Sequence, residues 1–229
     1  MKAALLLTPG EPLELVEVEL ADPIGREVLV DVRASGICHS DVTAARYVTH
    51  QGMPLLLGHE VAGVVRAIGP DVHGVAVGDH VVACEIRHCG NCDDCLRGRS
   101  YMCTRVDETE RTAEQGPRAA TDGVAVHQFS HIAGFAEQIL LHENNLVVID
   151  DDVPFEIAAV MGCGVVTGAG ATINAAQVRV GDTVAVIGCG GVGLSAIAGA
   201  AIAGARTIVA VDVVAEKLEL AREFGATHV

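Results

Sequence analysis

Four cysteines stand in one short stretch of the chain, at Cys89, Cys92, Cys95 and Cys103. Thiolates separated by two residues can turn toward a common point, and four of them satisfy a tetrahedral zinc ion without leaving an open position. The spacing therefore predicts a structural zinc site. The alternative is a pair of disulfides in a small secreted domain, but residues 1–11 have neither the cationic start nor the cleavage site of a secretory signal.

A glycine-rich motif lies farther along the chain, at Gly188-Cys-Gly190-Gly191-Val192-Gly193. It follows a predicted buried strand over 183–187 and opens a predicted helix over 194–203. In a dinucleotide site such glycines allow a tight turn and a close approach of the backbone to the pyrophosphate, and the helix N-terminus supplies amide donors. The motif, taken with the elements around it, predicts dinucleotide binding.

Asp212 ends the next predicted strand, 207–211, and indicates which dinucleotide is bound. A carboxylate about twenty residues beyond the glycines accepts hydrogen bonds from the ribose hydroxyls and repels a 2′-phosphate. The two residues that follow are valines, so no arginine is at hand for such a phosphate. The sequence predicts NAD rather than NADP. Lys217 could also reach the ribose, or be a solvated lysine paired with Glu216 or Glu219.

Other candidate metal ligands are scattered along the chain. Cys38 lies in Gly36-Ile-Cys-His-Ser-Asp41, His59 and Glu60 follow Gly58, and Cys163 lies between two glycines. Taken singly, Cys38 and Cys163 read as small buried hydrophobic residues, and His59 as a hydrogen-bonded core histidine. Spacing alone does not join them.

The elements that must position these residues change character near residue 150. Before it, short β-type segments (2–7, 13–20, 27–34, 60–68 and 80–83) alternate with turns and predict a compact, barrel-like β domain. The polar segment 104–122 is predicted to be a surface loop. After Pro154, helices and strands alternate, which predicts an α/β domain.

Composition limits the classes of function. The 229 residues carry 15 Lys plus Arg against 30 Asp plus Glu, a formal net charge of −15. That balance disfavours a nucleic-acid backbone or an anionic membrane surface as the main partner. We expect a cytoplasmic protein whose eight cysteines are metal ligands, catalytic groups or small core residues. Few residues are aromatic, so Val, Ala and Leu must build the core.

Two uncharged stretches, 157–178 and 183–205, are long enough to cross a bilayer. Both are rich in glycine, and neither is flanked by a Lys/Arg cluster or an aromatic belt. A buried strand followed by a helix under a sheet also gives a continuous apolar run. The sequence therefore favours core elements over membrane spans.

The motifs CHSD, GHE, CxxCxxC…C, GCG and GxGGVG, in this order, resemble those of the zinc-containing alcohol dehydrogenases of the medium-chain dehydrogenase/reductase family. The resemblance extends from Met1 to Val229. It implies a GroES-like β-barrel catalytic domain over residues 1–152. It also implies an incomplete Rossmann doubly wound NAD-binding domain over residues 153–229, so that the fold class is α/β plus β.

The same resemblance implies roles for the scattered residues. Cys38, His59 and Cys163 would hold a catalytic zinc whose fourth position is open, as a Lewis-acid zinc requires. Glu60 would be a nearby carboxylate that can exchange onto the metal, and Asp41 would orient the His59 imidazole. Together with the four-cysteine site this makes two zinc ions per chain.

Catalysis by such a protein is reversible hydride transfer between an alcohol or aldehyde and NAD. By resemblance, Ser40 passes the substrate proton outward and His39 lies against the cofactor pyrophosphate. Thr167 and Val192 match positions that pack on the nicotinamide. Many relatives continue the relay with a histidine where this chain has Thr43, so the relay must end differently, for example through water.

The substrate prediction is a primary alcohol or aldehyde. The polar insert after Cys103, together with Phe129-Ser-His131, most resembles the branch of thiol-adduct-dependent formaldehyde dehydrogenases. Glutathione-using members carry an arginine soon after the last structural cysteine, and this chain has Arg105 and then Asp107 near that place. That departure counts against a glutathione adduct.

The residues after Thr183 have room for two strand–helix units and the start of a third strand, whereas a doubly wound sheet of this order has about six strands. We therefore expect a fragment of an enzyme that is a homodimer or homotetramer when complete. The alternative is an inactive zinc-binding fragment or partial domain with an interaction role only.

Overall fold

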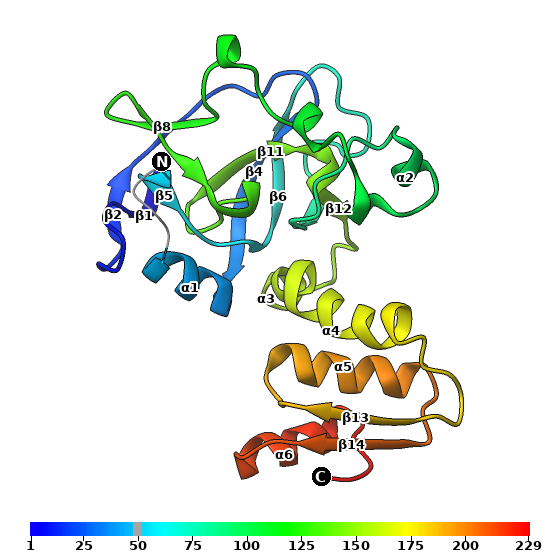
Figure 1. Ribbon diagram of the computed structural model, residues 1–229. Helices are drawn as coiled ribbons and strands as arrows, with labels where there is room; N and C mark the ends of the chain where they lie inside the picture. The colour runs from blue at the N-terminus through cyan, green and yellow to red at the C-terminus, as the bar shows by residue number, and fades with distance from the viewer. Residues whose placement is uncertain (48–51) are drawn as a thin grey trace. The chain divides into compact units, whose positions relative to one another are not determined.

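The structure is a computed structural model that describes residues 1–47 and 52–229. Its chain divides into two compact units, Met1–Gly162 and Cys163–Val229, each with a hydrophobic core of its own (Figure 1). The division falls after Gly162 rather than after Asp152, because helix α3 (Phe155–Val160) packs on the central sheet of the first unit. The predicted domain boundary lies close to this division and stays a prediction.

The central sheet of the first unit is antiparallel and has the strand order β11-β4-β6-β7-β12. Its strands are β4 (Glu27–Gly36), β6 (Glu60–Ile68), β7 (His80–Ala83), β11 (Gln138–His142) and β12 (Leu146–Val148). In the long β4–β6 pair, Val28 lies opposite Ile68 and Gly36 opposite Glu60. This register puts the end of β4 beside the start of β6, where two of the scattered ligand motifs lie.

Two smaller sheets complete the strands of this unit, with the orders β10-β5-β1-β2 and β3-β8-β9. Their strands are β1 (Lys2–Leu6), β2 (Glu14–Glu17), β3 (Glu19–Leu20), β5 (Leu55–Leu56), β8 (Ala119–Thr121), β9 (Val124–Ala125) and β10 (His127–Gln128). The strands described over 1–47 and 52–162 thus form three sheets and no closed barrel. Strands β2 and β3 are separated only by Val18, whose N–H donates to the Met1 carbonyl at 2.8 Å, and they belong to different sheets.

The core of the central sheet is aliphatic, as the scarcity of aromatic residues requires. Inward side chains of five strands meet there, among them Val28, Val61, Val81, Ile139 and Leu146. Side chains of this size contribute about 1.5–3 kcal/mol each when fully buried. The strand ends that carry the ligand motifs are therefore fixed by a well-packed sheet.

Helices and short turns connect the strands. The helices are α1 (His39–Tyr47), α2 (Asp93–Leu96) and α3, and the 3₁₀ turns are Ser100–Met102, Val106–Thr109, Ala113–Gln115, Phe129–His131 and Glu143–Asn145. The predicted surface loop 104–122 is more ordered than expected, because it contains two of these turns and β8. Arg111 and Arg118 from this segment pair with the buried Glu27 at 2.5 and 2.7 Å.

The second unit contains a parallel pair of strands, β13 (Thr183–Ile187) and β14 (Thr207–Val211). Its helices are α4 (Val166–Gly170), α5 (Gly191–Ile202) and α6 (Ala215–Glu223), with π-helical turns at Met161–Val165 and Ala171–Ala175. Leu194, Ile197 and Ile208 lie in its core. Strand β13 is not buried on both faces as predicted, since its side chains alternate and Ile187 is 84% exposed.

Of the two long apolar stretches, residues 183–205 fold into a strand and a helix rather than one helix. Among the residues that the structure describes, one continuous helical run, Phe155–Ala175, is long and apolar enough to cross a membrane, judged by length and composition. Core helices of water-soluble proteins pass the same test, so this is weak evidence for a membrane span.

Candidate functional site

The four predicted cysteine ligands converge. The sulfur atoms of Cys89, Cys92, Cys95 and Cys103 all lie within 4.8 Å of one another, and the closest pairs are 3.4 and 3.6 Å apart. None of the four forms a disulfide. A tetrahedral zinc with Zn–S bonds near 2.3 Å separates its sulfurs by about 3.8 Å, so this spacing fits the metal.

Backbone N–H groups point at the same sulfurs. Cys92 N donates to Cys89 Sγ at 3.3 Å, and Cys89 N donates to Cys103 Sγ at 3.3 Å. The pKa of Cys92 is lowered to about 6, chiefly by the backbone N–H of Cys95, whereas burial and the neighbouring Cys92 raise the pKa of Cys95 to about 12. One thiolate is therefore favoured at neutral pH, and four together need a cation among them.

A second group of ligand atoms forms where β4 ends and β6 begins. Cys38, His59 and Glu60 place their ligand atoms within 4.8 Å of one another, and His59 and Glu60 are buried. The β4–β6 register explains the convergence, because Cys38 follows the end of one strand and His59 precedes the start of the other. The fold thus joins residues that spacing alone did not.

Asp41 fixes this group from behind. Its carboxylate accepts hydrogen bonds from the backbone N–H of Cys38 at 3.0 Å and of Gly58 at 2.9 Å, and it contacts His59 Nδ1 at 3.2 Å. Burial raises the pKa of Asp41, but the His59 contact and the two backbone donors more than offset it and lower the pKa. A carboxylate that is ionised and anchored in this way orients the imidazole.

The other imidazole nitrogen, His59 Nε2, is buried and has no hydrogen-bond partner. The pKa of His59 is raised to about 9, chiefly by the hydrogen bond with Asp41, while burial opposes the shift. A buried polar atom without a partner calls for an explanation, and a bound metal ion would supply one. An imidazole whose Nδ1 is held by a carboxylate and whose Nε2 remains available is the arrangement of a metal-ligating histidine.

Glu60 owes its place to Gly36, which lies opposite it in the β4–β6 pair. A Cβ atom built at Gly36 would overlap the Glu60 carboxylate oxygen Oε2. The missing side chain therefore leaves the room that the carboxylate occupies beside the ligand group. This relation is not visible in the amino-acid sequence, because only strand register shows which residue faces Glu60.

The remaining residues predicted for this centre are placed as follows. His39 and Ser40 open helix α1 and are exposed, and Ser40 Oγ lies 3.7 Å from Cys38 Sγ. Cys163 lies in a π-helical turn and is the first residue of the second unit, directly after Gly162.

The glycine motif folds as expected within the second unit. Gly188 has φ of +95°, and a Cβ built at Gly193 would overlap the Gly188 carbonyl oxygen. Nothing lies within 4 Å of a Cβ built at Gly190 or Gly191. The first glycine thus makes the tight turn, the last allows helix α5 to pack closely, and the middle ones leave room for a ligand, as in a dinucleotide loop.

Asp212 lies against this loop. Its carboxylate accepts from the backbone N–H of Cys189 at 2.8 Å and of Val214 at 3.0 Å, and the Cys189 hydrogen bond is the main cause of its lowered pKa. Lys217 is exposed on helix α6. Thr167 and Val192 are also exposed, on α4 and α5, which pack closely because a Cβ at Gly168 would overlap the Val192 carbonyl oxygen.

Comparisons with known proteins agree with this arrangement. Residues 25–151 match the family model of the alcohol dehydrogenase GroES-like domain, and residues 191–229 match that of the zinc-binding dehydrogenases. The chain belongs to the zinc-containing alcohol dehydrogenases of the medium-chain dehydrogenase/reductase family. The GroES-like and Rossmann assignments predicted from the motifs are confirmed.

Individual alcohol dehydrogenases resemble the chain along its whole length. It is 40% identical over 234 residues to alcohol dehydrogenase B of Mycobacterium tuberculosis, and 39% identical over 230 residues to an S-(hydroxymethyl)glutathione dehydrogenase of Escherichia coli. The solved structure of benzyl alcohol dehydrogenase from Acinetobacter calcoaceticus has a TM-score of 0.89 at 39% identity. These matches cover 99–100% of this chain but 62% of each relative.

One neighbour of His59 escaped the sequence analysis. The Phe129 ring lies edge-on to the His59 imidazole, with centroids 5.5 Å apart and an interplanar angle of 72°. Phe129 is seventy positions away in the chain (129 − 59). Its motif was noticed as a mark of substrate class, and only the fold indicates that it packs against a candidate metal ligand.

Proposed function

We propose that the protein is a zinc-dependent alcohol dehydrogenase that transfers hydride reversibly between a primary alcohol or aldehyde and NAD. The observation that carries the proposal is the buried, unpartnered Nε2 atom of His59. It lies among Cys38 and Glu60, while Asp41 holds Nδ1 of the same ring. This donor set fits a zinc ion, and membership of the family supports the same metal.

Cys163 completes the proposed ligand set as the third protein donor. Support comes from Gly162, which immediately precedes it and belongs to the first unit. A Cβ built at Gly162 would overlap the Ala83 carbonyl oxygen, so the backbone there is pressed against strand β7. Neighbouring Cα atoms are about 3.8 Å apart, which limits how far Cys163 can lie from this fixed point.

When bound, zinc at this centre supplies a Lewis acid that polarises an alcohol or carbonyl oxygen. Ser40 would relay the proton of the alcohol outward: its hydroxyl oxygen accepts that proton while its own hydrogen passes to water, which is possible because the hydroxyl stands two residues after Cys38 on the exposed first turn of α1. Asp41 keeps the His59 ring in one orientation through Nδ1. The Glu60 carboxylate lies beside these ligands, in the space left by Gly36, and could exchange onto the metal.

The second unit binds the cofactor in this proposal. The amide groups at the start of α5 and the open space at Gly190 and Gly191 receive the pyrophosphate. The ionised Asp212 carboxylate accepts hydrogen bonds from the ribose and disfavours a 2′-phosphate, so NAD is preferred to NADP. Lys217 on α6 and His39 on α1 add positive or donor groups toward the cofactor, and Thr167 and Val192 pack on its nicotinamide.

For the substrate we favour a simple primary alcohol or aldehyde over a glutathione adduct. The relatives include an alcohol dehydrogenase, a benzyl alcohol dehydrogenase and an S-(hydroxymethyl)glutathione dehydrogenase, so similarity alone does not choose. Arg105, the arginine closest to the last cysteine of the four, is already paired with Glu108 at 2.5 Å. Asp107, two residues after Arg105, would repel the carboxylates of glutathione.

The test uses the protein expressed from its complete gene. We expect two zinc ions per chain by elemental analysis, and turnover of primary alcohols with NAD at least about tenfold more efficient than with NADP, since a single charge contact is worth on the order of 1.4 kcal/mol or more. Asp212→Ala should reduce that preference. A protein with one zinc, or one that uses NADP as well as NAD, would reject the corresponding part of the proposal.

A further inference from the structure

The segment that presents Phe129 to His59 has an unusual backbone. Ser130, His131 and Ala133 have φ angles of +51°, +59° and +67°, in the left-handed region that L side chains disfavour. Several such residues in one short segment persist only where the surroundings hold them. The conformation of residues 129–133 therefore depends on contacts outside the segment.

One end of the segment is held by the sheet. Ile132 and Ala133 are fully buried, and Gly134 N donates to the Gly58 carbonyl at 2.7 Å. Gly58 is the residue before His59, so this end of the segment is hydrogen-bonded to the backbone that leads into the His59 centre and strand β6. A Cβ at Gly134 would overlap Val61 Cγ2, which leaves no freedom for the backbone there.

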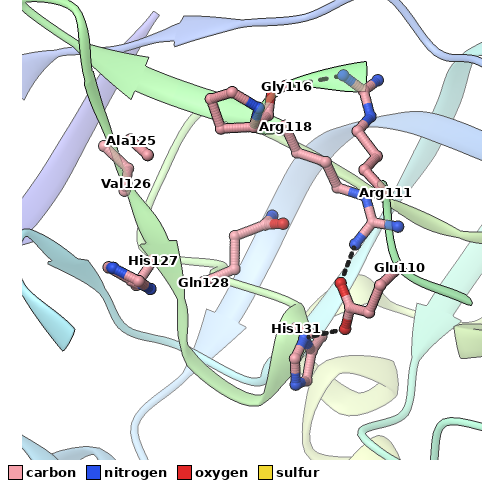
Figure 2. A pocket seen from close by; sticks show the side chains of 10 residues that line it. Glu110, Arg111, Gly116, Arg118, Ala125, Val126, His127, Gln128 and His131 are labelled. Atoms are coloured by element: carbon pink, nitrogen blue, oxygen red, sulfur yellow. Dashed lines mark hydrogen bonds and ion pairs between the residues drawn. The ribbon is translucent and has the colours of Figure 1, made fainter. Parts of the chain in front are cut away.

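At its other end the segment follows strand β10, whose backbone pairs with β5, and side chains hold the two residues after Phe129. Ser130 Oγ donates to Glu85 Oε2 at 2.9 Å, and His131 Nδ1 lies 2.8 Å from Glu110 Oε1. Figure 2 shows Glu110 between His131 and Arg118, on the wall of a hollow of about 300 Å³. Arg118 is 8% exposed and lies 3.4 Å from Glu110, and Arg87 also pairs with this carboxylate.

The Glu110 carboxylate is held by several partners at once, His131, Arg118 and Arg87. The hydrogen bond with His131 is the main cause of the lowered pKa of Glu110, and the two arginines add to it. Arg118 is itself fixed by the buried Glu27 at 2.7 Å and by the Thr109 carbonyl at 2.6 Å. Because Arg118 is fixed in this way, it can hold Glu110, and with it His131, in one place, which a mobile surface ion pair could not do.

We propose that Glu110 is a positioning residue for the His59 centre: through His131 it holds the left-handed segment in the conformation that keeps the Phe129 ring against the His59 imidazole. The proposal rests on the proposed function, because it assumes that His59 binds zinc. Asp41 fixes the ring through Nδ1 on one side, and Phe129 limits its tilt on the other. Loss of Glu110 should therefore loosen the metal without removing a ligand.

The test compares Glu110→Gln with Glu108→Gln, a matched control from the same 3₁₀ turn region whose exposed carboxylate pairs with Arg105. Zinc transfer to a chelator is followed over time, and the ion lost from the His59 centre is identified as the one that Cys38→Ser lacks. We expect Glu110→Gln to release this zinc about tenfold faster, as outer-sphere changes at metal sites do, and Glu108→Gln to release it at the parent rate.

A thermodynamic cycle with Phe129→Leu separates positioning from general loosening of the fold. If Glu110 acts through Phe129, the double variant should release zinc no faster than the faster single variant, whereas independent effects would multiply. Where Glu110→Gln does not fold, His131→Asn takes its place, since it leaves Glu110 with its two arginines.

Parent-like zinc release by Glu110→Gln, or multiplied effects in the double variant, would overturn the inference and leave the proposed function intact. A parent protein without zinc at the His59 centre would overturn both.

Discussion

The two groups of candidate metal ligands are assembled in different ways. The four cysteines come from one loop, and their sulfurs meet because the chain turns on itself between Cys89 and Cys103. Cys38, His59 and Glu60 come from the ends of two strands, and they meet because β4 and β6 pair in one register. The first group is therefore local to one loop, whereas the second is brought together by strands that lie apart in the sequence.

We therefore expect loss of a ligand to reduce the stability of the fold at the four-cysteine centre, but to reduce activity and spare the fold at the other centre. A closed site of four thiolates contributes its binding free energy to folding, because no preformed site exists in the unfolded chain. The geometry of an open site is set by the strands around it, which pack in the core with Val28 and Val61. We therefore expect the fold to survive without the metal.

Cys92→Ser should have the largest effect on stability. Cys92 lies in the middle of the four sulfurs, and zinc binding contributes on the order of 10 kcal/mol in small zinc domains. We expect the loss of one zinc and an unfolding free energy lower by several kcal/mol, measured by urea unfolding with metal analysis of the same samples. If Cys92→Ser unfolds like the parent, the loop does not depend on its metal.

Cys38→Ser should affect activity and spare the fold. It removes a proposed ligand of the open site, and we expect alcohol oxidation to fall by about a thousandfold or more because Lewis-acid assistance is worth several kcal/mol. Thermal unfolding should stay within a few degrees of the parent, and the four-cysteine zinc should remain. A large drop in melting temperature would erase the contrast between the centres.

The four-cysteine centre can be predicted from spacing alone, whereas the His59 centre cannot, because its residues are joined by strand register. The four cysteines and the glycine motif are local patterns, so spacing and flanking elements were enough, and the +95° φ of Gly188 bears out the expected turn. Cys38, His59 and Cys163 were joined only through family resemblance. Strand register cannot be read from composition, so the Gly36–Glu60 pairing and the Phe129 contact remained hidden.

The scaffold shows the same limit. Strands 60–68 and 80–83 were predicted with their observed bounds, because their hydrophobic runs end at clear turn signals. The segment 104–122 was taken for a loop, since its charges look like a solvated surface. Arg111 and Arg118 are in fact paired with the buried Glu27, and burial raises the pKa of Glu27 less than the two guanidinium groups lower it. Partners of buried charges lie far apart in the chain.

Ser40→Ala refines the comparison within the open centre. Ser40 is not a ligand, so both zinc ions and NAD affinity should be retained. Alcohol oxidation should fall about a hundredfold, as expected for the loss of a positioned proton-transfer group, and Ser40→Thr should keep most activity because it keeps the hydroxyl. The measurement is kcat/KM against pH for the three proteins. An alanine variant within about threefold of the parent would mean that water carries the proton.

The smallest expected effect concerns charge rather than coordination, and it uses the Cys38→Ser variant. In the parent chain the pKa of the His59 imidazole is raised to about 9, chiefly by the Asp41 hydrogen bond against the opposing effect of burial, and Cys38→Ser removes only the smaller contribution of Cys38. The unfolded value is 6.5. Because the folded pKa stays raised in the variant, the Asp41–His59 pair contributes its full stability below pH 6.5 and loses it as the pH rises through the folded pKa.

We therefore expect the unfolding free energy of Cys38→Ser to fall between pH 6.5 and 9 by on the order of 1–3 kcal/mol, as measured by urea unfolding at constant ionic strength. The parent should not show this fall, since a zinc-bound imidazole cannot take up the proton. Adding Asp41→Asn to Cys38→Ser removes the partner and should flatten the curve, which separates His59 from the cysteine thiols that titrate in the same range. An unchanged slope in that double variant would assign the fall to the thiols. The open centre would then differ from the closed one only in its ligands, because the Asp41–His59 pair would contribute no pH-dependent stability.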